Sequence, residues 1–188
     1  SGKPWVLDPV GIGIGQLRSD LLLELKQYKP AIVRGNASEI IALASLWGIE
    51  ANACESSRPR GVDTTDTVEA ARDAAAALAR YTGGAVAVSG KKDLVTDGEK
   101  VAYSEGGSEL MEKVTGFGCS QGGVLAVYAT ATNPFTAALA AAAHYNVAGS
   151  RAAKVADAPA SFKTAFIDEL YRATARDIAD NPFSVEEA

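Results

Sequence analysis

The segment richest in chemical possibility is the run Gly116-Phe117-Gly118-Cys119, which leads into an apolar, alanine-rich stretch. Glycines at alternate positions let backbone N–H groups turn toward a common point, and a following helix adds the partial positive charge of its N-terminus. Such a turn can cradle a phosphate, or the negative charge of a phosphoryl group in transit. A strand-to-helix turn without a ligand would have the same sequence. No GxxxxGK[ST] pattern occurs, so the run is not a P-loop.

Cys119 is placed by this pattern in the first turn of the expected helix, where the dipole favours a thiolate and a role in catalysis. The alternative is a small hydrophobic side chain buried beneath the helix. His144, the only histidine, lies in an alanine-rich helical stretch. That position favours a packing role for His144 over membership of a Ser/His/Asp set.

Polar residues follow three expected strands, and in open α/β sheets ligands bind at the carboxyl ends of strands. The residues are Asp8, the run Arg34-Gly35-Asn36-Ala37-Ser38-Glu39, and Ser89-Gly90. The guanidinium of Arg34 offers a two-pronged contact for phosphate, and the carboxylates of Asp8 and Glu39 could hold Mg²⁺ directly or through water.

Each of these residues also has a purely structural interpretation. Asn36 or Ser38 could cap a helix whose dipole Glu39 favours. Ser89 could contact a nucleotide or belong to an ordinary turn. A second glycine alternation, Gly11-Ile12-Gly13-Ile14-Gly15, fails the GxGxxG dinucleotide pattern because Gln16 stands at its sixth position, which favours a plain turn.

The elements that position these residues follow from periodicity and turn signals. We expect strands at 5–7, 31–33 and 85–88, a hairpin of 94–95 and 101–103 around Asp97-Gly98, helices at 17–28, 38–47, 67–81 and 161–174, and a loop at 48–66. The stretch 124–143 should divide into two helices at Asn133-Pro134. Alternating strands and helices predict one α/β domain over residues 1–188, with a mostly parallel central sheet and helices on both faces.

Composition excludes several other classes of protein. The chain has 188 residues, 47% of them hydrophobic, and a net charge of −5, which argues against a nucleic-acid-binding face. Neither a bilayer-spanning run nor a secretion signal is evident, and Cys54 and Cys119 form no zinc or disulfide pattern. The sequence thus predicts a cytoplasmic protein with no membrane or nucleic-acid partner. A buried strand this close to Ser1 indicates either a compact domain or the C-terminal part of a longer chain.

Taken together, the segments resemble hydroxyethylthiazole kinase, a family of the ribokinase-like superfamily. The resemblance extends to about Tyr171 and rests on segments in the family's order and approximate spacing: 5–10, 34–40, Gly61-Val62-Asp63, 88–90, 95–98 and 116–119. It implies a ribokinase-like fold and ATP-dependent phosphorylation of the alcohol of 4-methyl-5-(2-hydroxyethyl)thiazole in thiamine salvage. It further implies Mg²⁺ as cofactor, ATP as co-substrate and a homotrimer with the thiazole at a subunit interface.

The resemblance also implies roles for individual residues. Arg34 matches an ATP-contacting arginine, Asn36 belongs to the same ATP-binding run, and Ser89 replaces a nucleotide-contacting threonine. Gly116 matches a substrate-contacting glycine. Asp8 and Glu39 match acidic positions near the metal. Cys119 stands where most ribokinase-like enzymes have a catalytic Asp, so it is expected either to accept the proton of the alcohol or to position it.

Two departures from the family pattern affect these expectations. Phe117 replaces a small threonine, so a bulky ring is expected beside the anion cradle. The family's N-terminal third is absent, which predicts that this segment is a separate chain or missing. Two alternatives stay open: another ribokinase-like small-molecule kinase, although such enzymes normally keep Asp where Cys119 stands, and a catalytically weak nucleotide-binding or assembly subunit.

Overall fold

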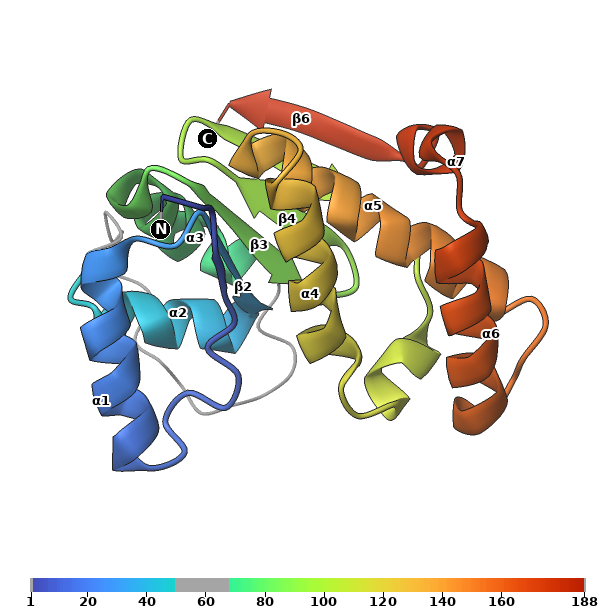
Figure 1. Cartoon of the computed structure of the whole chain (residues 1–188), viewed down its shortest axis with the longest axis horizontal. Coiled ribbons are helices and arrows are strands. Elements are labelled where there is room, and N and C mark those ends of the chain that lie inside the picture. The colour runs from blue at the N-terminus through green and yellow to red at the C-terminus, as the bar shows by residue number, and fades with distance from the viewer. Residues whose placement is uncertain (1, 50–67, 188) are drawn as a thin grey trace.

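A central sheet organises the computed structural model, which describes residues 2–49 and 68–187 (Figure 1). Within these residues the sheet has six strands, in the order β1-β2-β3-β4-β5-β6. Their bounds are β1 Val6–Leu7, β2 Ile32–Asn36, β3 Ala85–Ser89, β4 Asp93–Thr96, β5 Lys100–Ser104 and β6 Phe183–Glu187. β1, β2 and β3 pair in parallel, and β3 to β6 pair antiparallel.

Helices connect and cover these strands. They are α1 Gln16–Leu25, α2 Ala37–Leu46, α3 Arg72–Thr82, α4 Phe117–Ala129, α5 Pro134–Ala152, α6 Pro159–Arg172 and α7 Ala175–Ala179, with 3-10 turns η1 Lys26–Tyr28, η2 Val68–Ala71 and η3 Glu109–Lys113. The predicted break at Asn133-Pro134 is confirmed. The Asn133 side chain accepts a hydrogen bond from the Thr136 amide at 2.9 Å, and Pro134 occupies the first turn of α5, where its missing N–H costs nothing.

Both faces of the sheet are covered, as the continuous apolar character of β3 predicts. Val86 and Val88 pack with residues of α2 and α3 on one face. Ala85 and Ala87 pack with residues of α4 and α5 on the other face. The side chains of α5 that meet the sheet are small, among them Ala137, Ala138 and Ala141, so this helix can lie close to the strands.

A third cluster joins α6 to α5 and to the start of α4. Phe162 and Phe166 of α6 contact Phe117 of α4 and Tyr145 of α5, and all four side chains are buried. α6 therefore covers the outer side of α5 and the N-terminus of α4 rather than the sheet itself (Figure 1).

The predicted α/β fold class, a central sheet with helices on both faces, is confirmed with one refinement. Parallel pairing is confined to β1, β2 and β3, whereas the predicted hairpin and β6 make the rest of the sheet antiparallel. α7 and β6 were not predicted, because every residue of β6 is exposed and the short tail has no buried periodicity. Cys54, Gly61-Val62-Asp63 and nearly all of the predicted loop 48–66 lie outside the described residues.

Among the described helices, none is both long and apolar enough to cross a bilayer.

Candidate active site

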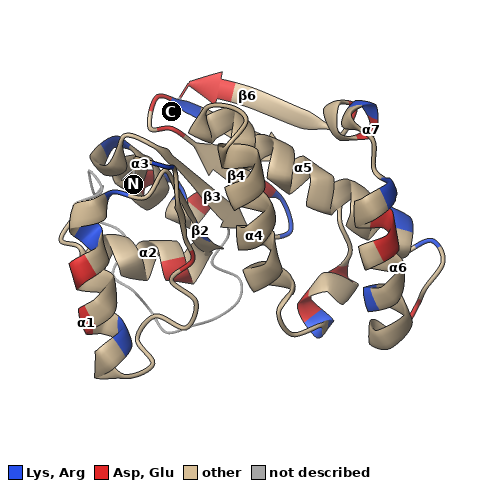
Figure 2. Cartoon of the chain, viewed as in Figure 1, with Lys and Arg blue, Asp and Glu red and all other residues tan. Residues whose placement is uncertain are grey.

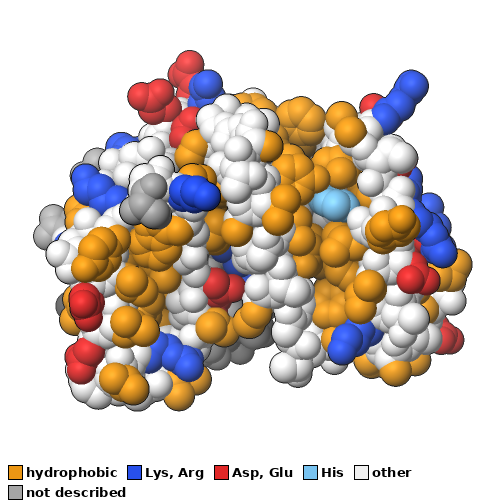
Figure 3. Space-filling view, in the orientation of Figure 1, with side chains coloured by type: hydrophobic (Ala, Val, Ile, Leu, Met, Phe, Trp, Pro, Cys, Tyr) orange, Lys and Arg blue, Asp and Glu red, His pale blue; other side chains and the backbone are white. Residues whose placement is uncertain are grey.

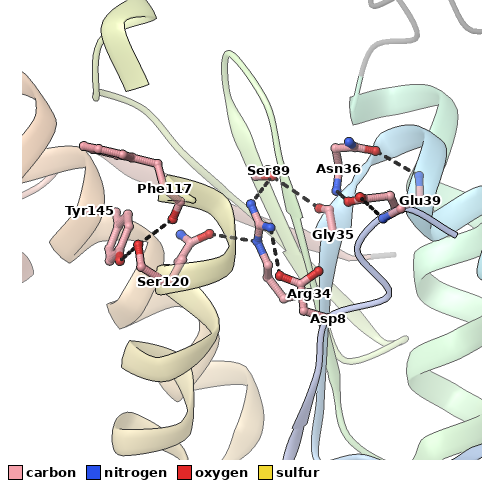
Figure 4. Close-up of polar contacts among 11 residues, drawn as sticks. Asp8, Arg34, Gly35, Asn36, Glu39, Ser89, Phe117, Ser120 and Tyr145 are labelled. Carbon is pink, nitrogen blue, oxygen red and sulfur yellow. Dashed lines mark hydrogen bonds and ion pairs between the residues drawn. The ribbon is translucent and has the colours of Figure 1, made fainter. Parts of the chain in front are cut away.

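Arg34, near the carboxyl end of β2, is the centre of the polar cluster at this edge of the sheet. The residue is only 8% exposed. Nε donates to Gln121 Oε1 at 3.1 Å, Nη1 contacts Asp8 Oδ2 at 3.2 Å, and Nη2 donates to Ser89 Oγ at 2.8 Å (Figure 4). The guanidinium is therefore fixed on three sides, as a preorganised cation for an anionic ligand must be.

Sheet topology explains why these groups meet. Asp8 directly follows β1, Arg34 belongs to β2, and Ser89 ends β3, so the three residues lie on adjacent parallel strands. Parallel strands bring their carboxyl ends to one edge, which is where ligands bind in open α/β sheets. The structure thus brings together Asp8, Arg34 and Ser89, three of the residues selected from the sequence.

The first turns of α4 close the cluster from the other side. A Cβ placed on Gly118 would lie 2.7 and 2.9 Å from Nη1 and Nη2 of Arg34, so the guanidinium packs directly against the helix backbone. No residue of α4 is charged, and Figure 2 shows this helix without blue or red. Positive potential at the cluster therefore comes from Arg34 and from the N-terminal amides of α4.

Gly116 and Cys119 occupy the exposed side of the same helix start. Gly116 is the N-cap of α4 with φ of 91°, a conformation that favours glycine, and a Cβ there would meet nothing within 4 Å. Cys119 is a free, exposed thiol in the first turn. The alternative of a small hydrophobic side chain buried beneath the helix is therefore wrong.

The ring of Phe117 does not enter the anion cradle. It points away from Arg34 (Figure 4) and packs against Phe162 and Phe166, with ring centroids 5.8 and 4.5 Å away. The side chain at this position serves the α6 cluster, and only its backbone belongs to the turn. The expectation of a bulky ring beside the cradle is therefore wrong, because the helix start directs this side chain to the opposite side.

Asp8 has the electrostatic properties of a cation ligand. Burial raises the pKa of Asp8 and the nearby Glu39 charge raises it further, whereas the charge and hydrogen bond of Arg34 lower it. Among the described residues, Oδ1 of Asp8 is buried without a hydrogen-bond partner. A buried acceptor without a donor is costly, and a bound cation would satisfy it.

Glu39 and Asn36 form a capping box at the start of α2 (Figure 4). The Asn36 side chain accepts from the Glu39 amide at 2.9 Å, and Glu39 Oε2 accepts from the Asn36 amide at 2.9 Å. Glu39 Oε1 also accepts from the Gly11 amide at 3.3 Å, which ties the glycine turn after β1 to α2. The helix-capping interpretation of Asn36 is confirmed.

Metal ligation at this edge would therefore depend mainly on Asp8. Both oxygens of Glu39 already accept protein hydrogen bonds, so Glu39 is better placed to act through water. Within the two described ranges, no group of three or more His, Cys, Asp and Glu side chains gathers in a metal-binding arrangement. One free carboxylate oxygen still suits Mg²⁺, which commonly binds one or two carboxylates together with waters and substrate phosphates.

Two residues outside the predicted set complete the description. Gln121 was missed because the sequence does not fix which side chains of α4 face Arg34, and its only signal is a polar residue shortly after the glycine-rich turn. His144 Nε2 lies 2.8 Å from the Leu170 carbonyl and Nδ1 lies 3.1 Å from the Tyr128 hydroxyl, so both ring nitrogens are engaged away from Arg34. The packing role predicted for His144 agrees with these contacts.

Comparison with known structures gives the class of fold first. Pyridoxal kinase from Staphylococcus aureus in complex with ADP superposes with a TM-score of 0.60 at 18% identity, covering 98% of this chain and 63% of that chain. The hydroxyethylthiazole kinase protein of Pyrococcus horikoshii OT3 gives a TM-score of 0.81 at 31% identity, covering 100% and 66%. The fold is thus that of ribokinase-like kinases.

Sequence comparison gives the family. The profile of the hydroxyethylthiazole kinase family matches residues 1–176. A hydroxyethylthiazole kinase of Bifidobacterium longum (strain DJO10A) is 46% identical over 98% of this chain and 64% of its own length, and one of Corynebacterium glutamicum (strain R) is 44% identical over 95% and 65%. The chain belongs to the hydroxyethylthiazole kinase family. It spans somewhat less than two thirds of the length of these curated relatives.

Proposed function

We propose that this chain carries the nucleotide and phosphoryl-transfer part of a kinase that phosphorylates the hydroxyl of 4-methyl-5-(2-hydroxyethyl)thiazole with ATP. The observation that carries the proposal is the buried Arg34 guanidinium, held by Asp8 and Ser89 against the first turns of α4. Phosphoryl transfer has a loose transition state, so fixed positive charge and alignment matter more than a strong base. Family membership supports the same activity.

In this proposal, Arg34, Asn36 and Ser89 contact ATP. In the capping box the Asn36 side chain uses only Oδ1, and among the described residues its Nδ2 has no hydrogen-bond partner, so Nδ2 can donate to the nucleotide. The backbone from Gly116 to Cys119 receives the transferring phosphoryl group. Gly116, which is exposed and without neighbours at its Cβ position, leaves room for the thiazole alcohol.

Cys119 is the residue proposed to act on the attacking hydroxyl. Its thiol is exposed on the same helix turn that forms the cradle. The oxygen of the alcohol forms a bond to the γ-phosphorus of ATP as the bond to the ADP oxygen breaks, and the hydroxyl proton leaves to Cys119 or to water. A strong base is not needed in a loose transition state, so positioning of the alcohol suffices as a role for the thiol.

Mg²⁺ is the cofactor that this site would use. Asp8 would hold it through its unpartnered Oδ1, with Glu39 acting through water, and the metal would neutralise charge on the nucleotide phosphates. Removal of Mg²⁺ by a chelator should therefore abolish turnover.

A second proposal concerns the assembly. We infer that the active form is a cytoplasmic homotrimer that includes a further segment of polypeptide, supplied by a separate chain or by the same one. Support comes from the length of the relatives and from large hydrophobic side chains that are exposed on and just before α1: Ile14 at 74%, Leu17 at 85% and Leu21 at 53%. Figure 3 shows hydrophobic side chains gathered over this helix.

One experiment tests the kinase activity and its dependence on a further segment of polypeptide. The purified chain is incubated with ATP, Mg²⁺ and the thiazole alcohol, and the phosphate ester is detected by mass spectrometry. The incubation is repeated with the N-terminal third of the Bifidobacterium longum relative added as a separate polypeptide. Product in either incubation supports the kinase. ADP binding without product in both supports the alternative of a nucleotide-binding or assembly subunit.

A further inference from the structure

Asp93, the first residue of β4, forms a second polar cluster at the same edge of the sheet. Its Oδ1 accepts from the Gly90 amide at 3.1 Å, and its Oδ2 accepts from Asn146 Nδ2 of α5 at 3.1 Å. Asn146 is 5% exposed and also donates to Ser104 Oγ at 3.1 Å. The carboxylate thus receives two fixed donors, one from its own turn and one from the helix behind it.

Gly90 is confined on two sides by this arrangement. Asp93 holds its amide, and a Cβ added to Gly90 would lie 2.4 Å from Cγ2 of Val68 in η2. Gly90 directly follows Ser89, so the clamp on its amide fixes the backbone at the end of β3. The Ser89 hydroxyl accepts from Arg34 at 2.8 Å and donates to the Gly35 carbonyl at 3.4 Å.

We propose that Asp93 is a positioning residue for nucleotide binding: its ionised carboxylate clamps Gly90 and thereby holds Ser89 against Arg34. Among the described residues, Asp93 forms no hydrogen bond or ion pair with Arg34, so it is proposed to act through the turn. The inference rests on the proposed function of Arg34 and Ser89 as nucleotide-binding residues. Asp93 lies outside the cluster formed by Asp8, Arg34 and Ser89. Through Asp93, the affinity for nucleotide would depend on protonation.

Protonation would remove one of the two bonds, because a carboxylic acid presents one acceptor oxygen and one donor where two donors now point. Burial raises the pKa of Asp93 to about 6, although the bonds from Gly90 and Asn146 and the charge of Arg34 lower it. Lys92 on this turn and Glu105, which directly follows β5, form an exposed ion pair at 3.0 Å. Asp93 therefore changes charge within a pH range where the protein can be studied.

The experiment compares ADP binding by wild type and Asp93→Asn in isothermal calorimetry at pH 8 and pH 5.5. Asparagine keeps the shape but has one acceptor oxygen, like the protonated acid. At pH 8 the dissociation constant of the variant should exceed that of wild type about three- to tenfold, the effect of one hydrogen bond. At pH 5.5 this ratio should fall by at least half, because most wild-type molecules then carry a neutral Asp93.

Asp97→Asn is the matched control. Asp97 lies just past the opposite end of β4 and accepts from the Glu99 and Lys100 amides at 3.0 and 2.8 Å, so it caps the hairpin without contacting the Ser89 turn. Its ADP affinity should equal that of wild type at both pH values. A ratio for Asp93→Asn that is unity at pH 8, or that stays constant between the two pH values, overturns the inference.

A measurement on wild type alone decides the matter if Asp93→Asn fails to fold. The Gly90 amide resonance should titrate with Asp93, and saturating ADP should move the midpoint to lower pH, because coupling between two binding events is reciprocal. An unchanged midpoint would contradict the clamp. Failure of wild type to bind ADP is a different outcome, because it removes the proposed nucleotide site itself along with the clamp.

Discussion

Removal of the Arg34 side chain is the most informative single perturbation of this protein. Arg34→Ala leaves Ser89 and Gln121 without their donor and leaves Asp8 without its only cation partner in the described structure. The Arg34 and Asp8 side chains are 9% and 16% exposed, so water replaces the lost contacts poorly. Breaking a buried pair by removing one partner costs about 3–5 kcal/mol of unfolding free energy.

The cost should depend on pH, and the sign follows from Asp8. Burial already holds the pKa of Asp8 above its ordinary value of 3.8, and Arg34 opposes this rise. Without Arg34 the pKa rises further, so the ionised carboxylate becomes more costly in the folded state. A group with a raised folded pKa contributes stability at low pH and loses that contribution as the pH rises through the folded pKa. Destabilisation by Arg34→Ala should therefore be larger at pH 8 than at pH 4, close to the ordinary pKa of an aspartate.

Urea unfolding, followed by the fluorescence of the buried Trp47, measures both quantities. The double variant Asp8→Asn/Arg34→Ala serves as the control, because an amide cannot carry the unpaired charge. Its unfolding free energy should exceed that of Arg34→Ala at pH 8, and this excess should be smaller at pH 4. Equal losses for Arg34→Ala at both pH values, or no rescue by Asp8→Asn, would refute the electrostatic reasoning.

Four further substitutions examine the first half of α4. Gly118→Ala should displace the Arg34 guanidinium and weaken ADP binding in calorimetry, whereas Gly122→Ala, whose Cβ meets nothing within 4 Å, should stabilise the helix by about 0.5–1 kcal/mol and leave binding unchanged. Phe117→Ala should lower the unfolding free energy by about 3–5 kcal/mol in urea without altering the ADP dissociation constant of the folded protein. Cys119→Asp should raise stability by about 0.3–1 kcal/mol through the helix dipole and retain or increase turnover; a folded but inactive variant would show that the thiol itself is required.

Local signals in the sequence were sufficient for the elements that carry the site. Buried apolar runs ended by glycine, proline or polar residues predicted β1, β2 and β3, and the carboxyl-end rule then placed Asp8, Arg34 and Ser89 at one edge. The Asp97-Gly98 signal gave the β4–β5 hairpin. These predictions succeed because each depends on a few neighbouring residues.

Contacts that depend on the rotation or tilt of a whole helix could not be predicted in the same way. Gln121 meets Arg34 across 87 positions of sequence. The ring of Phe117 faces α6 because the helix turns it there, and a glycine-rich motif alone does not specify that direction. β6 is determined by pairing with β5, since its own residues are all exposed and provide no hydrophobic pattern.

The alternation of β2 nevertheless accounts for the side on which Arg34 lies. Ile32 packs on the face covered by α4 and α5, and Val33 packs on the face covered by α2 and α3. Arg34 stands two residues after Ile32 and so lies on the same face of the sheet. Gly118 and Gln121 of α4 contact it on that face. A shift of one residue in β2 would bury Val33 against α4 and turn the guanidinium toward α2. The alternation of hydrophobic side chains in β2 thus fixes the direction in which the Arg34 guanidinium points. The proposed chemistry depends on that guanidinium.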